Sequence, residues 1–244
     1  MEKPVECIGC SLINIGESFC PGEGPLDAKL VIVAEAPRAE EARTGRPLVG
    51  GSGRLFDALC SASNVSRSDA YITNTIKCRP PNNIIPSDFN VNECTSRYLD
   101  KELASLTNKN CILTLGDTAA SYLYKPVGIT DWRGSIVSTK YGKVVLALHP
   151  DFIMREYSNF AITILDFKRA LRESATPLMP DVKEQFILDP TLQDVKDFFI
   201  GASKVSFDIE STINSRCILM ISFCRYDNMR TICIPLVSKS GKDY

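Results

Sequence analysis

Apolar residues in the first part of the chain follow two alternating patterns. Continuous apolar runs, or runs in which every second residue is apolar, predict buried strands. Such runs occupy residues 29–36, 70–77 and 111–115. Apolar residues at helical spacing between and after these runs predict helices. The helices are expected at residues 54–62, 88–106, 117–124 and 160–173. Strands that alternate with helices favour a three-layer α/β/α domain with a mainly parallel sheet.

Two further details of this domain follow from the same pattern. The β-rich runs 135–140 and 143–148 meet at a Tyr-Gly turn, which predicts a hairpin. In the last helix, Ile164, Leu165 and Leu171 are expected to form the buried side.

The pattern breaks after that helix. Pro177 and Pro180 lie in a stretch without periodicity, which is typical of an interdomain linker. A helix near 192–199 follows, and then come three strand-like runs, at 204–209, 217–225 and 230–236. We therefore expect a first domain over residues 1–175, a linker over 176–185 and an incomplete second α/β domain over 186–244.

Composition limits the class of protein and its compartment. Charged residues make up 23% of the 244 residues and apolar residues 44%, which are ordinary values for a globular protein. The formal net charge of -1 neither requires nor excludes a nucleic-acid partner, because basic groups can gather at one site. No apolar run has membrane-spanning length, and the start of the chain has no signal-peptide core. A cytoplasmic protein without a membrane partner is therefore expected.

Ten cysteines in a reducing compartment favour metal ligation over a disulfide framework. Cys7 and Cys10 form a C-x2-C pair, and Cys78 and Cys94 form a second, wider pair. Four such thiolates can surround a zinc ion or a [4Fe-4S] cluster, and the spacing does not distinguish the two. The simpler alternative is that they are ordinary buried thiols. Burial as small hydrophobic residues is expected for the other six, which are Cys20, Cys60, Cys111, Cys217, Cys224 and Cys233.

Several motifs occur in a fixed order around the paired cysteines. After the C-x2-C pair come GEGPLDAKLVIVAEAP (22–37), EEARTGRPLVGGSGRL (40–55), YITNTIKCRPPNNIIP (71–86), Leu-Gly (115–116) and Leu-His-Pro (148–150). In order and spacing this series resembles the family 4 uracil-DNA glycosylases over residues 7–171. The resemblance implies a uracil-DNA-glycosylase-like fold and a [4Fe-4S] cluster held by Cys7, Cys10, Cys78 and Cys94.

The resemblance also assigns two residues to the base. Enzymes that act on a base flip it out of the duplex and read its edge in a closed pocket. The amide of Asn74 can both donate to and accept from O4 and N3 of uracil, and cytosine presents the opposite pattern. An N–H of His149 is expected to stabilise the negative charge that develops on uracil O2. Without the resemblance, Asn74 would be interpreted as a strand-end cap, and His149, the only histidine, as a structural residue.

Further catalytic and pocket residues follow from the same alignment. Glu35 lies in the water-activating motif, where a carboxylate can position water and stabilise a cationic sugar. Glu41 is a second catalytic candidate, and its alternative is a solvated loop charge. The backbone of Ala34 and Ala36 is expected to line the pocket.

Other positions concern phosphate contacts and departures from the family. Ser52, in a Gly-rich turn that enters a helix, and Arg155 are expected to bind substrate through phosphate, and an ordinary turn and a surface charge are the alternatives. Leu48 stands where the family has a phenylalanine that stacks on uracil. An aliphatic side chain covers the base but loses stacking worth on the order of 1–3 kcal/mol. Arg38 and Ala34 stand where the family has glycines.

Asp208 and Glu210 end a predicted strand in the second domain. Alternation places both carboxylates on one face, where they can share a divalent ion such as Mg2+ or Mn2+. This resembles the first motif of DEDD-type 3′–5′ exonucleases and implies the start of a ribonuclease-H-like domain. The family's other carboxylates would lie beyond Tyr244, so this chain is not expected to be a competent nuclease. A charged strand end is the alternative.

A glycosylase-like unit followed by an exonuclease start resembles the amino-terminal part of some phage family A DNA polymerases. The leading hypothesis is an enzyme that recognises and excises uracil from DNA, coupled to replication. The chain is then expected to be a fragment or split-gene product of such a polymerase, with DNA and the replication machinery as partners in the bacterial host cytoplasm. The first rival is a catalytically weakened DNA-binding iron–sulfur module, and the second is a zinc-stabilised nucleotide-binding domain.

Overall fold

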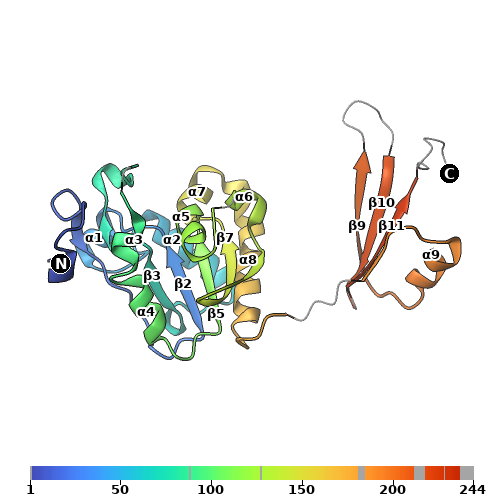
Figure 1. The fold of residues 1–244 in the computed structure, drawn as a ribbon, viewed down its shortest axis with the longest axis horizontal. Coiled ribbons are helices and arrows are strands. Elements are labelled where there is room, and N and C mark those ends of the chain that lie inside the picture. Colours follow the sequence, from blue (N-terminus) through green and yellow to red (C-terminus); the bar gives the residue numbers. More distant parts are fainter. Residues whose placement is uncertain are drawn as a thin grey trace. The chain divides into compact units, whose positions relative to one another are not determined.

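The computed structural model describes residues 2–87, 89–126, 128–180, 185–211, 218–227 and 229–236. The chain divides into two compact units, residues 1–179 and 180–244 (Figure 1). The division falls inside the stretch predicted as a linker. Within the described residues, no helix is both long enough and apolar enough to cross a bilayer.

The described part of the first unit contains a five-stranded sheet of order β3-β2-β5-β7-β6. Its strands are β3 (Tyr71–Asn74), β2 (Leu30–Ala34), β5 (Cys111–Leu115), β7 (Gly142–Ala147) and β6 (Ile136–Thr139). The first four run parallel, and β6 pairs antiparallel with β7 as the predicted hairpin requires. Every residue of β2, β3 and β5 is buried, which explains why their sequences show continuous apolar runs.

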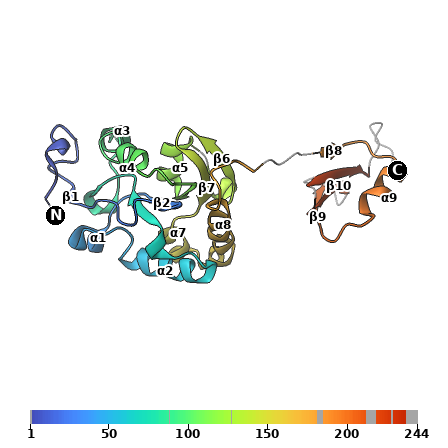
Figure 2. The same ribbon diagram turned by 90° about the horizontal axis from the view of Figure 1, so that it is seen from below.

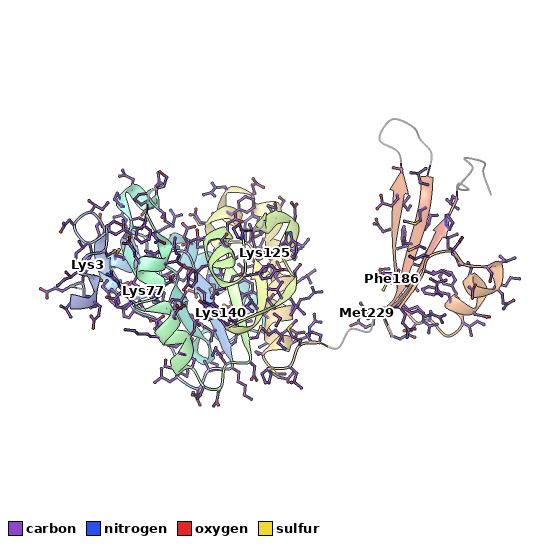
Figure 3. All side chains as sticks on the ribbon, in the orientation of Figure 1. Lys3, Lys77, Lys125, Lys140, Phe186 and Met229 are labelled. Atoms are coloured by element: carbon purple, nitrogen blue, oxygen red, sulfur yellow. The ribbon has the colours of Figure 1, made fainter. Side chains whose placement is uncertain are left out.

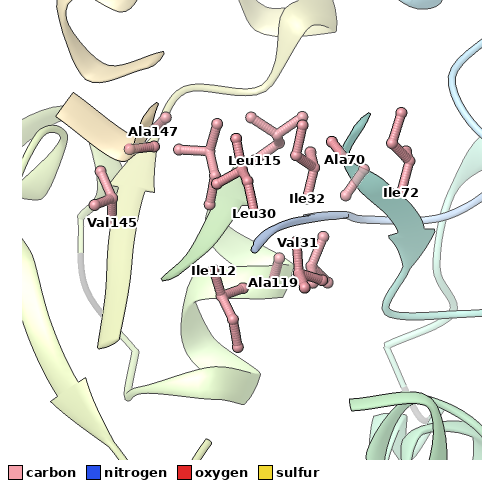
Figure 4. Close-up of a cluster of buried hydrophobic side chains, with 14 of the residues drawn as sticks. Leu30, Val31, Ile32, Ala70, Ile72, Ile112, Leu115, Ala119, Val145 and Ala147 are labelled. Carbon is pink, nitrogen blue, oxygen red and sulfur yellow. The ribbon is translucent and has the colours of Figure 1, made fainter. Parts of the chain in front are cut away.

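Helices cover both faces of this sheet. One face carries α2 (Gly51–Ser63), α7 (Pro150–Arg155) and α8 (Phe160–Glu173), and the other carries α4 (Leu99–Ser105) and α5 (Asp117–Leu123) (Figure 2). Side chains from both faces of the sheet and from the helices pack into one apolar cluster (Figure 4). The result is an α/β layer structure in which the loops after the parallel strands share one edge of the sheet.

The structure corrects two helix predictions. One helix was expected over residues 88–106, and the described part of this stretch contains two, α3 (Val91–Thr95) and α4. In α8, Leu165 and Leu171 are exposed, and the fully buried positions are Thr163, Asp166, Phe167 and Ala170. Asp166 points inward because it pairs with Arg133, whose Nε donates to the carboxylate over 2.8 Å. A polar residue therefore occupies the face that the apolar pattern assigned to leucines.

Short elements that apolar periodicity did not predict complete the first unit. They are η1 (Val5–Cys7), β1 (Glu17–Phe19), α1 (Ala39–Thr44), η2 (Arg67–Asp69), β4 (Cys78–Arg79), η3 (Pro81–Asn83), α6 (Ile129–Trp132) and η4 (Tyr157–Asn159). Strands β1 and β4 pair antiparallel and bring the amino-terminal segment onto the loop after β3.

A buried lysine holds the end of the first unit in place. The Lys143 ammonium donates to the Glu173 carboxylate and to the backbone carbonyls of Thr176 and Leu178, each over 2.8 Å. Its side chain is fully buried, so these three acceptors replace the water that the charge loses. Residues up to Leu178 are consequently fixed on the first unit, although the sequence places the start of the linker earlier.

The second unit contains a smaller sheet in its described part. Its elements are β8 (Gln185–Ile187), α9 (Leu192–Phe199), β9 (Val205–Ser211), β10 (Ile218–Arg225) and β11 (Arg230–Pro235). The strand order is β8-β11-β10-β9, with β9, β10 and β11 antiparallel and β8 parallel to β11. The helix and the last three strands match the predicted positions, while β8 was not predicted. Cys217, expected to be a buried thiol, lies outside the described residues.

Candidate functional site

The parallel strands bring the predicted site residues to one edge of the sheet. Ala34 is paired in register with Asn74, and Leu115 is paired with Ala147, at the carboxyl ends of their strands. The residues that follow these strands therefore leave the sheet on the same side. Because neighbouring strands lie about 4.8 Å apart, β3 and β7 are separated by roughly 14 Å at this edge.

A cleft of about 330 Å³ opens at this edge. Its described lining comprises Glu35, Arg38, Gly116, Asp117, Gly128, Ile129, Thr130, Leu148, His149, Asp151, Phe152 and Arg155. Three predicted site residues, Glu35, His149 and Arg155, thus share one cleft. Asn74 and Leu48 do not belong to this described lining, although Asn74 ends the strand next to the one that leads to Glu35.

His149 is partly exposed and oriented by its own backbone neighbour. It precedes α7, and its Nδ1 accepts a hydrogen bond from the Asp151 N–H over 3.1 Å. The neutral imidazole must then carry its proton on Nε2. Burial lowers the pKa of His149, which favours this neutral form, against the opposing effect of the Glu35 and Asp151 carboxylates. The imidazole can therefore offer an Nε2–H donor near neutral pH.

Gly116 fits closely against this histidine. Its φ of 89° lies in the left-handed region, and an added Cβ would come within 3.0 Å of the His149 Cβ. Both facts favour glycine at this position. The Leu-Gly motif after β5 thus has a structural reason, because it lets the histidine loop approach the neighbouring strand.

Glu35 is held by a neighbouring hydroxyl. The Thr118 Oγ1 donates to its carboxylate over 2.7 Å, and its backbone carbonyl accepts from the Ile76 N–H over 2.9 Å. Ala34 is buried and its carbonyl accepts from both the N–H and the Oγ1 of Thr75, whereas Ala36 is partly exposed. The Glu35 carboxylate lines the cleft, and the single hydrogen bond from Thr118 leaves it the capacity to accept others there.

Asn74 is buried at the end of β3 with only 2% of its surface exposed. Among the described residues, no group accepts a hydrogen bond from its Nδ2. Leaving a buried amide unpaired costs on the order of 1–3 kcal/mol, so native proteins rarely keep such a group without a use. This unpaired amide is available to a polar ligand, and the role of Asn74 in base recognition stays a prediction.

Glu41 serves its own loop in the structure. It is 3% exposed, and its carboxylate accepts hydrogen bonds from the backbone N–H groups of Val49, Gly50 and Arg38 over 2.8–3.1 Å. These contacts tie the start of α1 to the start of α2. Glu41 does not belong to the described cleft lining, so these contacts give it a supporting position, and its catalytic role stays a prediction.

We expect Glu41→Ala to lower the free energy of unfolding by roughly 3 kcal/mol or more, because it leaves buried N–H groups without their acceptor. Urea unfolding followed by circular dichroism measures this change. The neighbouring Glu40, exposed and paired only with Arg43 over 2.8 Å, supplies the matched control. Glu40→Ala should leave the unfolding midpoint nearly unchanged, and equal losses in the two variants would contradict the supporting role.

Leu48 is buried in the apolar cluster and is 4% exposed. Its φ of 51° is unusual for a residue with a branched side chain. The Arg67 guanidinium donates to the carbonyls of Pro47 and Leu48, each over 2.8 Å, and so holds this strained turn. An added Cβ on Gly53 would meet the Leu48 backbone at 2.3 Å, which explains the glycine there. Ser52, which precedes Gly53 in the first turn of α2, is also buried.

Two arginines share one carboxylate at the rim of the cleft. Arg38 and Arg155 both pair with Asp151, at 2.8 and 2.7 Å. The two guanidinium groups make the rim locally basic, which suits a phosphate, although the Glu35 and Asp117 carboxylates line the same cleft. Arg38, the departure from the family glycine, therefore adds a cation to the cleft.

The four paired cysteines line a single cavity. Cys7 follows the amino terminus, Cys78 begins β4 and Cys94 lies in α3, yet all three and Cys10 face the same space. Burial raises the pKa of Cys78 to about 11 and that of Cys94 to about 12, because a free thiolate would be poorly solvated there.

Polar groups already contact two of these sulfurs. The Lys77 N–H donates to the Cys94 Sγ over 3.3 Å, and the Tyr98 hydroxyl lies 3.0 Å from the Cys7 Sγ. Such hydrogen bonds commonly surround thiolates that bind metal. The Lys3 ammonium, labelled in Figure 3, holds the loop that follows the C-x2-C pair. It donates to the carbonyls of Leu12, Ile13 and Gly16.

Four thiols around one cavity suit either a zinc ion or an iron–sulfur cluster. Among the described residues, no three ligand-type side chains are grouped as the ligands of a single metal ion. Four sulfurs on one zinc ion would lie about 4 Å apart, since each Zn–S bond is about 2.3 Å long. A four-iron cluster is a wider body that needs thiols set further apart around a common space.

Lys77 connects the cysteine cavity to the strand of Asn74, a role that residue spacing does not indicate. Its ammonium is 1% exposed and lies 2.5 Å from both the Thr73 Oγ1 and a Glu102 carboxylate oxygen (Figure 3). The other Glu102 oxygen accepts from the Gly22 N–H over 3.2 Å. Spacing alone does not distinguish a buried polar residue from one on the surface. The sequence therefore does not indicate that Lys77, Glu102 and Thr118 contact the site residues.

Asp208 and Glu210 lie on β9 in the second unit. Their register partners are Ser222 and Met220 on β10, so both carboxylates lie on the same face of the sheet. Both are exposed, and β9 forms an edge of the described sheet. The two carboxylates therefore lie on one face, as the alternation of side chains along a strand predicts. No third ligand-type side chain joins them among the described residues.

Comparison with known proteins gives matches over the first unit. A family model described as "Uracil DNA glycosylase superfamily" matches residues 21–174. A "Type-4 uracil-DNA glycosylase" of Thermotoga maritima is 38% identical over 161 residues, which is 65% of this chain and 83% of that protein. A protein of the same description from Sulfurisphaera tokodaii is 30% identical over 217 residues, or 85% of this chain and 91% of that protein. A "DNA polymerase" of Bacillus phage SP01 is 26% identical over 200 residues, or 78% of this chain and 21% of that protein.

Proposed function

Because the chain belongs to the uracil DNA glycosylase superfamily, we propose that its first unit takes an uracil extruded from DNA and hydrolyses its N-glycosidic bond. The observation that carries the proposal is the buried amide of Asn74, which has no partner among the described residues and lies on the sheet edge that also positions His149 and Glu35. A buried amide without a protein partner suits the edge of a base that it reads.

The proposed reaction uses each of these residues once. Asn74 binds the O4 and N3 edge of the base and orients it. As the bond between the sugar C1′ and the base N1 breaks, its electron pair stays with uracil, and the His149 Nε2–H stabilises the charge on O2. Glu35 stabilises the cationic sugar and accepts a proton from the water whose oxygen adds to C1′. The uracil anion takes up a proton from the solvent as Glu35 releases the one it accepted, so the products are free uracil and an abasic site.

Cys7, Cys10, Cys78 and Cys94 would hold the [4Fe-4S] cluster. When bound, the cluster cross-links the amino-terminal segment to the loop after β3 and to α3. The chain's own contact from Cys94 to the Lys77 N–H then fixes the segment that carries Asn74.

An oligonucleotide with one uracil tests the function. Incubation with the purified chain and then with alkali should cleave the strand at the abasic site, and an oligonucleotide with thymine in place of uracil should stay intact. Tight binding without cleavage would favour the rival function, a DNA-binding iron–sulfur module. That rival draws support from Leu48, which is buried in the core and offers no aromatic ring to the base.

We also propose that the second unit begins a 3′–5′ exonuclease domain of a replication polymerase. Support comes from the antiparallel order of β9, β10 and β11, from Asp208 and Glu210 on one face, and from the similarity to a phage DNA polymerase. Two carboxylates supply only part of a two-metal site, so weak metal binding without nuclease activity is expected.

We expect Asp208→Asn with Glu210→Gln to abolish weak Mn2+ binding by the second unit, because no carboxylate then remains on that face of β9. Titration of free Mn2+ by electron paramagnetic resonance measures the bound ion. Asp197→Asn, on α9, is the control, since Asp197 contacts Gln193 rather than the β9 face. Binding that is equal in the double variant and in the unchanged chain refutes the metal site.

A further inference from the structure

Two aromatic rings and a lysine form a cluster on the surface of the first unit. The rings of Tyr124, at the end of α5, and Trp132, at the end of α6, have centroids 6.0 Å apart. The Lys125 ammonium lies 5.0 Å from the Tyr124 centroid and 5.2 Å from the Trp132 centroid, within the range of a cation–π interaction (Figure 3). Trp132 keeps 37% of its surface exposed, and Lys125 is exposed.

This cluster belongs to the loop that walls the cleft. Gly128, Ile129 and Thr130, which lie between its members in the sequence, line the cleft that contains His149. The part of the loop that carries Trp132 is held by two contacts, because the Ile129 N–H donates to the Asp117 carboxylate over 3.1 Å and Arg133 pairs with the buried Asp166. The exposed ring of Trp132 and the partly exposed ring of Tyr124, which packs against the core, are therefore presented next to the place where an extruded nucleotide would enter.

We propose that Tyr124, Lys125 and Trp132 form a platform on which a base of single-stranded DNA stacks, beside the nucleotide whose uracil is removed. The inference rests on the proposed function of the cleft. Exposed aromatic faces bind the faces of unpaired bases with little regard to sequence, and a lysine within reach adds a phosphate contact. Bases in a duplex have both faces covered by their neighbours, so the platform favours the single strand. The adjacent Asp131 carboxylate opposes phosphate, which makes stacking the larger contribution.

The chain contains a single tryptophan, so Trp132 reports its own contacts. Titration with a uracil-free single-stranded oligonucleotide should quench the tryptophan emission in parallel with the binding seen by anisotropy of labelled DNA. A duplex of the same sequence should quench it less at equal saturation. The absence of uracil separates this measurement from excision.

Variants assign the effect to the platform. Trp132→Leu keeps apolar surface but removes the aromatic ring, and it should weaken single-strand binding about 5- to 100-fold, since stacking contributes on the order of 1–3 kcal/mol per base. Trp132→Phe should restore most of the affinity, and circular dichroism of both variants checks that they fold. Rescue by phenylalanine separates stacking from a structural role of the side chain.

Lys125→Gln tests the phosphate contact. It should reduce the slope of log affinity against log salt by about 0.7, the value for one contact with a single strand. The matched control is Lys140→Gln, because Lys140 lies 4.8 Å from the Tyr141 centroid in the β6–β7 turn, at the opposite edge of the sheet from the cleft. That variant should leave the slope unchanged.

The outcomes separate the platform from the glycosylase proposal. Unchanged emission at saturating DNA, or wild-type affinity in Trp132→Leu, refutes the platform and leaves excision untouched. Loss of excision on a uracil substrate with the quench retained refutes the proposed reaction and leaves the platform standing. A chain that binds no single-stranded DNA but excises uracil from a duplex likewise refutes the platform and leaves the proposed reaction standing.

Discussion

His149→Ala is expected to slow uracil excision by about 100- to 1,000-fold, the usual loss when one donor to a developing negative charge is removed. Its Nε2–H has a fixed direction, because the Asp151 N–H occupies Nδ1. Single-turnover cleavage of the uracil oligonucleotide measures the rate of the chemical step. His149→Gln retains an N–H donor and should keep more activity than the alanine variant. Equal binding of DNA by all three proteins is required for this interpretation.

Asn74→Ala provides the companion measurement to this prediction. It should reduce excision as strongly, while its free energy of unfolding stays close to that of the unchanged chain. The reason is that the substitution removes a buried amide Nδ2 that has no partner among the described residues. A purely structural asparagine would show the reverse, with stability lost and excision retained in the folded fraction.

The pH dependence of excision follows from the state of the imidazole. Burial lowers the pKa of His149 below its ordinary value of 6.5, so the neutral donor predominates at pH 7. The rate should therefore stay level from about pH 8 to 7 and fall in more acidic solution, because a proton on Nδ1 displaces the Asp151 N–H. The stability that this neutral histidine contributes is likewise present above pH 6.5 and is lost as the pH falls through the lowered pKa. A rate that rises on acidification would assign the role to the imidazolium.

Much of the fold could be predicted because its strands are buried on both faces. The runs that became β2, β3 and β5 are apolar throughout, and the helices between them carry regular apolar spacing. Parallel strands then place Asn74 and the loop of His149 at one edge without any further information. The four cysteines that the resemblance assigns to a cluster line one cavity, and their role as its ligands stays a prediction.

What could not be predicted depends on contacts between distant polar groups. Glu41 is recognisable as a loop carboxylate, but its three backbone donors exist only once α1 and α2 are placed. Leu48 stands where the resemblance places a residue that stacks on the base. Arg67 binds the Leu48 carbonyl and holds the Leu48 backbone in a left-handed turn, and the Leu48 side chain is buried in the core. Asp166 reverses the apolar pattern of α8 because its partner Arg133 comes from another element. Periodicity records which residues are apolar, and it does not record such partners.

Cys94→Ala is expected to lower the stability of the first unit more than any other single substitution of a cysteine. Through a bound cluster, Cys94 in α3 would be linked to Cys7, and this link would close the loop of chain between residues 7 and 94. A cross-link of that span contributes about 4 kcal/mol, which corresponds to a fall in Tm of roughly 8–16 °C. The iron content and the charge-transfer absorbance of the purified protein should fall with it. Iron analysis, visible absorbance and thermal unfolding measure the three effects on one sample.

Cys20→Ala is the matched control for this prediction. Cys20 is also fully buried, and its N–H donates to the Lys77 carbonyl over 2.7 Å, yet its thiol does not belong to the described lining of the cysteine cavity. Removing its sulfur should cost about 1 kcal/mol through a small void and leave the iron content unchanged. Metal analysis that finds zinc in place of iron would favour the zinc-stabilised domain, because both metals suit four thiolates. Equal effects of the two substitutions, with no metal in either protein, would mean that the four thiols only pack together. The segment that carries Asn74 would then be held by the ion pair between Lys77 and Glu102 instead of by a cluster.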